Sequence, residues 1–149
     1  MRSIRLLTGF LLAACAFTAG VEAPFSTSLA KVTILVHDQD EALKFYTEML
    51  GMEKRFDQTA NGMRFLTVAP KGQPLPELIL LKADSDKQHL VGKNPTWVID
   101  TDDCRKAYAI LKNRGVKFLT EPAVASYGIQ ATFADLYGNP FALVERKKH

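Results

Sequence analysis

The sequence predicts an α+β fold of two βαβββ modules whose paired curved sheets surround a cup-shaped cavity. Three observations predict it. The order of strand, helix and three strands occurs twice between residues 29 and 147. Each expected helix stops at a glycine, Gly51 in the first half and Gly115 in the second. Each module has one sheet and one helix, so we expect the two inner sheet faces to face each other and enclose the ligand site.

The first module is expected to cover residues 29–88. Its first strand is β-branched, and its helix begins at Asp38, which forms a capping-box pattern with Glu41. Ala42 starts an apolar stripe along that helix. The expected elements are a strand at residues 30–36, a helix at 37–51 and strands at 53–56, 62–69 and 76–83.

The second module is expected to cover residues 95–147, after a polar boundary segment. Its helix is expected to be capped near Thr101 and to bury Cys104 as a small hydrophobic side chain. In its last strand Ala142 and Val144 share one face, which we expect to line the cavity. The expected elements are strands at residues 95–100, 116–120, 129–135 and 141–145 and a helix at 101–115.

The composition favours a single domain with a short N-terminal appendage. The 149 residues include 19 Lys and Arg and 16 Asp and Glu, which gives a formal charge of only +3. This balance, without a basic stripe, argues against nucleic acid as a partner. The three histidines, His37, His89 and His149, are too scattered for a metal site or a triad. The sequence also lacks a phosphate-binding loop, a nucleophile elbow and a cysteine pair at metal-binding spacing.

The N-terminus has the pattern of an export signal at residues 1–14. Two arginines accompany an apolar run that is too short to span a bilayer. The run ends in LAAC, which resembles a bacterial lipobox, so we expect Cys15 to be lipidated and residues 15–28 to form a tether. The alternative is an ordinary secretory signal that is cleaved later, after Gly20 or Ala23. Either way we expect the chain in the cell envelope on the periplasmic side, lipid-anchored or otherwise secreted to the periplasm.

Two segments resemble motifs of the vicinal oxygen chelate superfamily, which includes glyoxalase I, extradiol dioxygenases and bleomycin-resistance proteins. The segments are VHDQDEALKFYTEMLG at residues 36–51 and SYGIQATFADLYGNPFALVE at residues 126–145. The resemblance covers residues 29–147 and implies a glyoxalase-like domain that forms a homodimer. Because this fold carries several chemistries, the resemblance does not by itself identify an activity.

Metal-dependent members of this superfamily hold a divalent ion with one side chain from each of four strands. Counting from the matching motifs, the resemblance places these positions at Lys31, Leu80, Thr96 and Ala142. An ammonium group repels a cation, and leucine and alanine side chains have no donor atom. We therefore expect no metal, no other cofactor, and neither metal-dependent glyoxalase nor dioxygenase activity.

An apolar cup with a few polar groups is typical of a site for a small organic ligand. Lys31 is expected to pair with an anionic group of the ligand, to act as a base, or to lie along the rim with its ammonium in water. Tyr127 is expected to stack on the ligand or to pack against the protein. The predicted ligand-binding residues are Lys31, Thr33, Leu80, Thr96, Tyr127, Gln130 and Ala142.

Three functions are compatible with these patterns. The leading hypothesis is an exported protein without the family's metal ligands, which binds a small organic molecule or acts as an envelope scaffold. The second is a lyase, isomerase or dioxygenase-type enzyme with an atypical site. The third is a purely structural partner without a ligand. No catalytic residue is assigned, and we expect contact with the membrane only through the lipid anchor.

Overall fold

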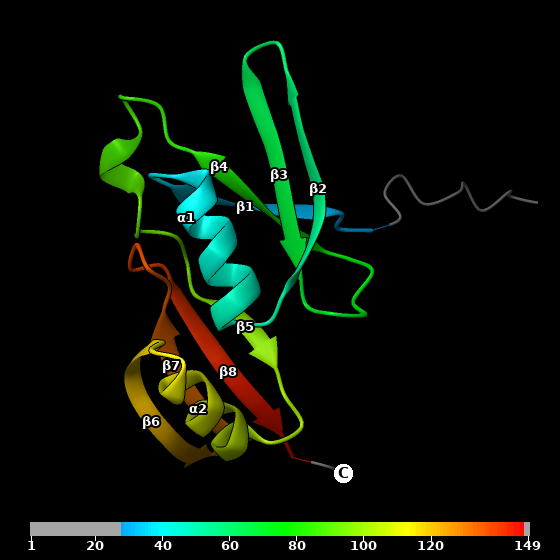
Figure 1. The fold of residues 1–149 in the computed structure, drawn as a ribbon. Coiled ribbons are helices and arrows are strands. Elements are labelled where there is room, and N and C mark those ends of the chain that lie inside the picture. The colour runs from blue at the N-terminus through cyan, green and yellow to red at the C-terminus, as the bar shows by residue number, and fades with distance from the viewer. Residues whose placement is uncertain (1–27, 148–149) are drawn as a thin grey trace, which may run out of the picture.

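The computed structural model describes residues 28–147 and contains two four-stranded sheets, each accompanied by a helix (Figure 1). The strand order is β1-β4-β3-β2 in the first sheet and β5-β8-β7-β6 in the second. β1 pairs parallel with β4, and β5 pairs parallel with β8. The predicted α+β class with two βαβββ modules is confirmed. The expected signal peptide, Cys15 and nearly all of the expected tether lie outside the described residues.

The two modules contain the same elements in the same order. The first comprises β1 (Lys31–Val36), α1 (Gln39–Lys44), the π-helical turn η1 (Phe45–Met49), β2 (Glu53–Ala60), β3 (Met63–Ala69) and β4 (Glu77–Lys82). A short 3₁₀ turn, η2 (Gln88–Leu90), lies between the modules. The second comprises β5 (Trp97–Asp100), α2 (Cys104–Asn113), β6 (Lys117–Ala125), β7 (Gly128–Ala134) and β8 (Pro140–Arg146).

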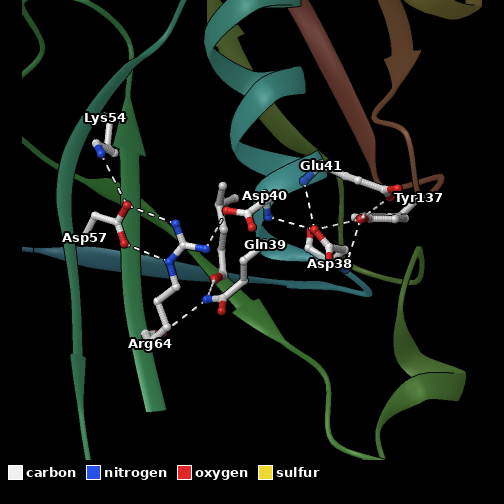
Figure 2. A network of polar contacts seen from close by, with 9 residues as sticks. Asp38, Gln39, Asp40, Glu41, Lys54, Asp57, Arg64 and Tyr137 are labelled. Atoms are coloured by element: carbon white, nitrogen blue, oxygen red, sulfur yellow. Dashed lines mark hydrogen bonds and ion pairs between the residues drawn. The ribbon is translucent and has the colours of Figure 1, made fainter. Parts of the chain in front are cut away.

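Asp38 caps the first helix, as predicted, but the second half of the predicted capping box is replaced. The carboxylate of Asp38 accepts hydrogen bonds from the backbone N–H groups of Asp40 (2.8 Å) and Glu41 (2.9 Å). The backbone N–H of Asp38 donates to the hydroxyl of Tyr137 (3.0 Å) instead of to the Glu41 side chain (Figure 2). Tyr137 belongs to the turn between β7 and β8, so the second module completes the cap of the first module's helix.

The second helix is capped by Asp103, two residues after the predicted cap. Its carboxylate accepts from the backbone N–H of Lys106 (2.9 Å), and Thr101 lies just outside the helix. Cys104 is fully buried, and burial raises the pKa of its thiol. This agrees with its predicted role as a small hydrophobic side chain and does not favour a reactive thiolate.

The helix-bearing faces of both sheets pack into one hydrophobic core. Ile34 and Leu80 of the first sheet and Phe141 of the second belong to this core, together with Tyr46 of the first helix. The rings of Tyr46 and Phe141 lie 6.1 Å apart in an edge-to-face arrangement. The opposite face of each sheet lies outside this core and is open. A single chain therefore leaves these two faces uncovered, and both sheets are open.

A polar network fastens the β2–β3 hairpin to the first helix (Figure 2). The guanidinium of Arg64 contacts the carboxylates of Asp57 and Asp40, each at 2.7 Å. Hydrogen bonds from Arg64 lower the pKa of Asp57 to about 2. The amide of Gln39 donates to the backbone oxygens of Arg64 (3.1 Å) and Leu80 (2.8 Å). Every member of the network has a partner within the fold, which indicates a structural role.

Candidate functional site

The open face of the first sheet carries a row of side chains that crosses all four strands. Strand register places Thr33 beside Ile79, Ile79 beside Thr67, and Thr67 beside Phe56. Paired residues of neighbouring strands point to the same side of a sheet. Phe65 lies two residues before Thr67 and therefore shares this face. The predicted site residue Thr33 thus belongs to the open face.

The open face of the second sheet carries the equivalent row. Val98 pairs with Ala142, Ala142 with Thr132, and Thr132 with Thr120. Gln130 lies two residues before Thr132 on the same face. The predicted site residues Gln130 and Ala142 therefore lie on one open face, as the alternation of the last strand indicated.

Leu80 does not belong to either open face, so its predicted place in the ligand site is wrong. Leu80 pairs with Ile34, and both side chains are fully buried under the first helix. In the second module Ala142 pairs with Val98, and the equivalent pair in the first module is Ile79 with Thr33. Ile79 is therefore the counterpart of Ala142. The count from the family motifs gave Leu80, one residue after Ile79, because the strand ELILLK is apolar on both faces.

Lys31 lies on the open face, where its ammonium is held by a carboxylate that the sequence interpretation missed. The Nζ of Lys31 lies 2.6 Å from an Oε2 oxygen of Glu77, its cross-strand neighbour. The hydrogen bond from Lys31 lowers the pKa of Glu77. The ammonium of Lys31 is therefore paired with a carboxylate of the same chain. The sequence analysis expected instead a ligand contact, a base, or a lysine with its ammonium in water. Glu77 was missed because only the parallel strand register brings it beside Lys31.

Thr96 and Tyr127 lie at the margins of the second sheet. Thr96 immediately precedes β5 and is exposed. Tyr127 lies in the turn between β6 and β7, is half exposed, and its hydroxyl is hydrogen-bonded to the side chain of Gln130. Within one chain, the predicted site residues outside the core therefore form two groups. Lys31 and Thr33 lie on the first sheet. The second sheet and its margins carry Thr96, Tyr127, Gln130 and Ala142.

The residues present do not fit a divalent metal. At the positions that the resemblance implies, Lys31 is a cation already paired with Glu77, and Ala142 has no donor atom. The structurally corrected second position, Ile79, also has none. Among residues 28–147, no group of three or more His, Cys, Asp or Glu side chains is arranged to hold a metal ion.

The open faces instead present apolar surface with a few polar groups. Phe56 and Phe65 are 44% and 45% exposed on the first sheet, and Val98 is 58% exposed on the second. Exposed large apolar side chains gathered on one face are typical of a binding surface. In the part of the chain that the structure describes, no helix has the length and apolar character needed to cross a membrane.

Two βαβββ modules with open four-stranded sheets are the architecture of the glyoxalase fold. Residues 28–143 match the glyoxalase/bleomycin resistance protein/dioxygenase superfamily, so the chain belongs to that superfamily. It is 34% identical over 125 residues to the uncharacterized protein YurT of Bacillus subtilis, with 76% of this chain and 95% of YurT covered.

Two solved structures are similar to this chain in both sequence and fold. The crystal structure of UcmS2 shares 37% identity and a TM-score of 0.74, covering 80% of this chain and 98% of UcmS2. TnmS3, an antibiotic binding protein from Streptomyces sp. CB03234, shares 30% identity and a TM-score of 0.75, covering 84% of this chain and all of TnmS3.

Proposed function

We propose that this chain binds a small, largely apolar organic molecule without a metal, in a site that two copies of the chain complete together. The observation that carries the proposal is the pair of open sheet faces with half-exposed Phe56, Phe65 and Val98. Removing this surface from water stabilises a complex by about 25 cal/mol for each Å² buried. Apolar surface with a few polar groups is the chemistry of a binding site for an organic molecule.

A homodimer would enclose the ligand. The two modules bury their helix-bearing faces against each other within one chain, so the open faces have no partner there. In a twofold dimer, the first sheet of one copy faces the second sheet of the other, and two equivalent cups result. The family resemblance also implies a homodimer.

The polar groups on the open faces would orient the ligand. The Lys31–Glu77 ion pair offers a donor and an acceptor on the first sheet. Gln130, with Tyr127 bonded to it, offers an amide on the second. A few polar groups on an apolar lining give a site specificity for an organic molecule. That TnmS3 is an antibiotic binding protein supports a ligand of this general kind.

The location of this binding is the cell envelope. Residues 1–15 combine an arginine-flanked apolar run with the LAAC pattern, which supports export and lipidation at Cys15. The proposal rests on the sequence of this segment alone. It places a ligand-binding domain on the periplasmic side, held to the membrane by a lipid.

Native mass spectrometry of the protein purified from its own host tests this function. The expected result is a dimer that carries an organic molecule and loses none of it after treatment with a chelator. A monomer without any bound organic molecule, or a stoichiometric metal ion in the folded protein, would contradict the proposal.

A further inference from the structure

We propose a second ligand site, in a groove between the two modules that adjoins the open face of the second sheet at Val98 and binds an amphipathic monocarboxylate. We call it the junction groove. It is made of two cavities of about 280 and 530 Å³. Both are lined by Met52, Pro70, Ile99 and Asp100, so the two cavities adjoin. Together their lining residues extend from the end of the first module's helix, past β5, to the start of β1.

The walls of the junction groove are mainly apolar. Leu111, Phe133 and Leu143 line the first cavity, and Leu78 and Phe141 line the second. These side chains belong to the edge of the shared core, which holds them in place in the free protein. A pre-formed apolar channel of this size fits a short hydrocarbon chain or a small ring system.

One end of the junction groove is positively charged. Lys71 and Arg114 line the first cavity, and neither forms an ion pair with a carboxylate among residues 28–147. The guanidinium of Arg114 donates to the backbone oxygen of Met49 (3.1 Å), which fixes its place at the rim and leaves further N–H groups for a ligand. The carboxylate of Asp100 in the groove is paired with Arg146 at 3.0 Å. The charge that remains at this end is complementary to a carboxylate.

The indole of Trp97 lines the second cavity. The Nε1 atom of its indole is buried, and no acceptor for it is present in the described part of the chain. A buried polar group without a partner costs stability. The groove therefore offers cations at one end and apolar walls along its length, and an amphipathic carboxylate matches both.

Trp97 also makes the site measurable, because it is the only tryptophan of the chain. The test is a fluorescence titration of the purified protein with sodium decanoate below its micelle concentration, and with the uncharged decanol for comparison. We expect a saturable change with decanoate. In the double variant Lys71→Met/Arg114→Met, decanoate should bind about tenfold more weakly, since two exposed charge contacts are lost. The affinity for decanol should not change.

Two control variants distinguish binding in the junction groove from a general effect of charge and from binding on the open face. Lys112→Met removes a positive charge from the same helix outside the groove and should leave decanoate binding unchanged. Phe65→Ser alters the open face and should also leave it unchanged, so this site can fail independently of the proposed dimer cup. The proposal is overturned if decanoate produces no saturable change in Trp97 fluorescence, or if the double variant, folded by circular dichroism, binds decanoate as tightly as the wild type.

Discussion

The hydroxyl of Tyr46 in the first module donates a 2.8 Å hydrogen bond to the carboxylate of Asp135 in the second. Asp135 also accepts from the backbone N–H groups of Tyr137 and Asn139, each within 2.9 Å, and from the Asn139 side chain. Tyr46 and Asp135 lie in the two segments that carry the family resemblance. In this chain those motifs therefore hold the modules together.

Tyr46→Phe should destabilise the protein by about 1–3 kcal/mol, because it removes a buried hydrogen bond and leaves an oxygen of Asp135 with one partner fewer. Urea unfolding at neutral pH measures the change. Tyr108→Phe is the matched control, since the Tyr108 hydroxyl contacts Glu121 near the surface (3.2 Å). An equal effect of both substitutions would show that the contact between the modules carries no special stability.

The Asp57–Arg64 contact should make stability depend on pH in the acid range. The folded-state pKa of Asp57, about 2, lies below its ordinary value of 3.8. The charged carboxylate therefore stabilises the folded protein above about pH 4, and this contribution disappears as the pH falls toward about 2. Asp57→Asn should be less stable than the wild type near neutral pH and nearly equal to it at the acid end.

Urea unfolding across this pH range tests the Asp57 prediction. Asp84→Asn serves as the control for the loss of one negative charge, because Asp84 forms only an exposed pair with Lys87 (3.3 Å). A difference between Asp57→Asn and the wild type that grows as the pH falls would contradict the assignment.

The corrected strand register predicts how a metal site can be built. The set Lys31→His, Ile79→Glu, Thr96→His and Ala142→Glu should create nickel or zinc affinity in the dimer, since all four side chains would then carry donors. Replacing Ile79→Glu in this set by Leu80→Glu should abolish that affinity and destabilise the fold, because it buries a carboxylate in the core. Calorimetric titration with nickel compares the set that contains Ile79→Glu with the set that contains Leu80→Glu. Metal binding only by the set with Leu80→Glu would contradict the corrected strand register.

Processing at Cys15 is a separate prediction from the N-terminal sequence. The mature chain should begin at Cys15 and carry lipid, and Cys15→Ser should leave an unlipidated precursor. Mass spectrometry of the mature N-terminus in the producing cell decides between lipidation and ordinary cleavage. An unmodified N-terminus after Gly20 or Ala23 would support the secretory alternative.

Local patterns predicted the elements of the fold but not the contacts between them. Alternation predicted that Ala142 and Phe141 lie on opposite faces of their strand, and the strand register agrees, because Ala142 pairs with Val98 and Phe141 with Trp97. Burial alone does not separate the two faces, since Phe141, Ala142 and Leu143 are all buried. The same reasoning failed at Leu80, because both faces of its strand are apolar. The alternation of side chains there does not distinguish the buried face from the open one.

Two contacts could not be predicted from local sequence patterns. The bond between Asp38 and Tyr137 joins residues 99 positions apart, and the Lys31–Glu77 pair joins residues 46 apart. Such partners depend on how the sheets and modules pack, so a capping box with Glu41 was the natural local prediction for Asp38. The sequence pattern also does not show which faces of the two sheets pack together.

The proposed ligand site combines the first sheet of one copy with the second sheet of the other, and subunit mixing tests this arrangement most directly. Ile79→Trp blocks the first open face and Ala142→Trp the second, so each homodimer should lose binding of Nile red, a neutral aromatic dye. A purified mixed dimer with one copy of each variant would contain one cup with both substitutions and one with neither. The account predicts that this mixed dimer regains about half of the wild-type binding. A mixed dimer that binds no more dye than its parent homodimers would contradict a site shared between two chains.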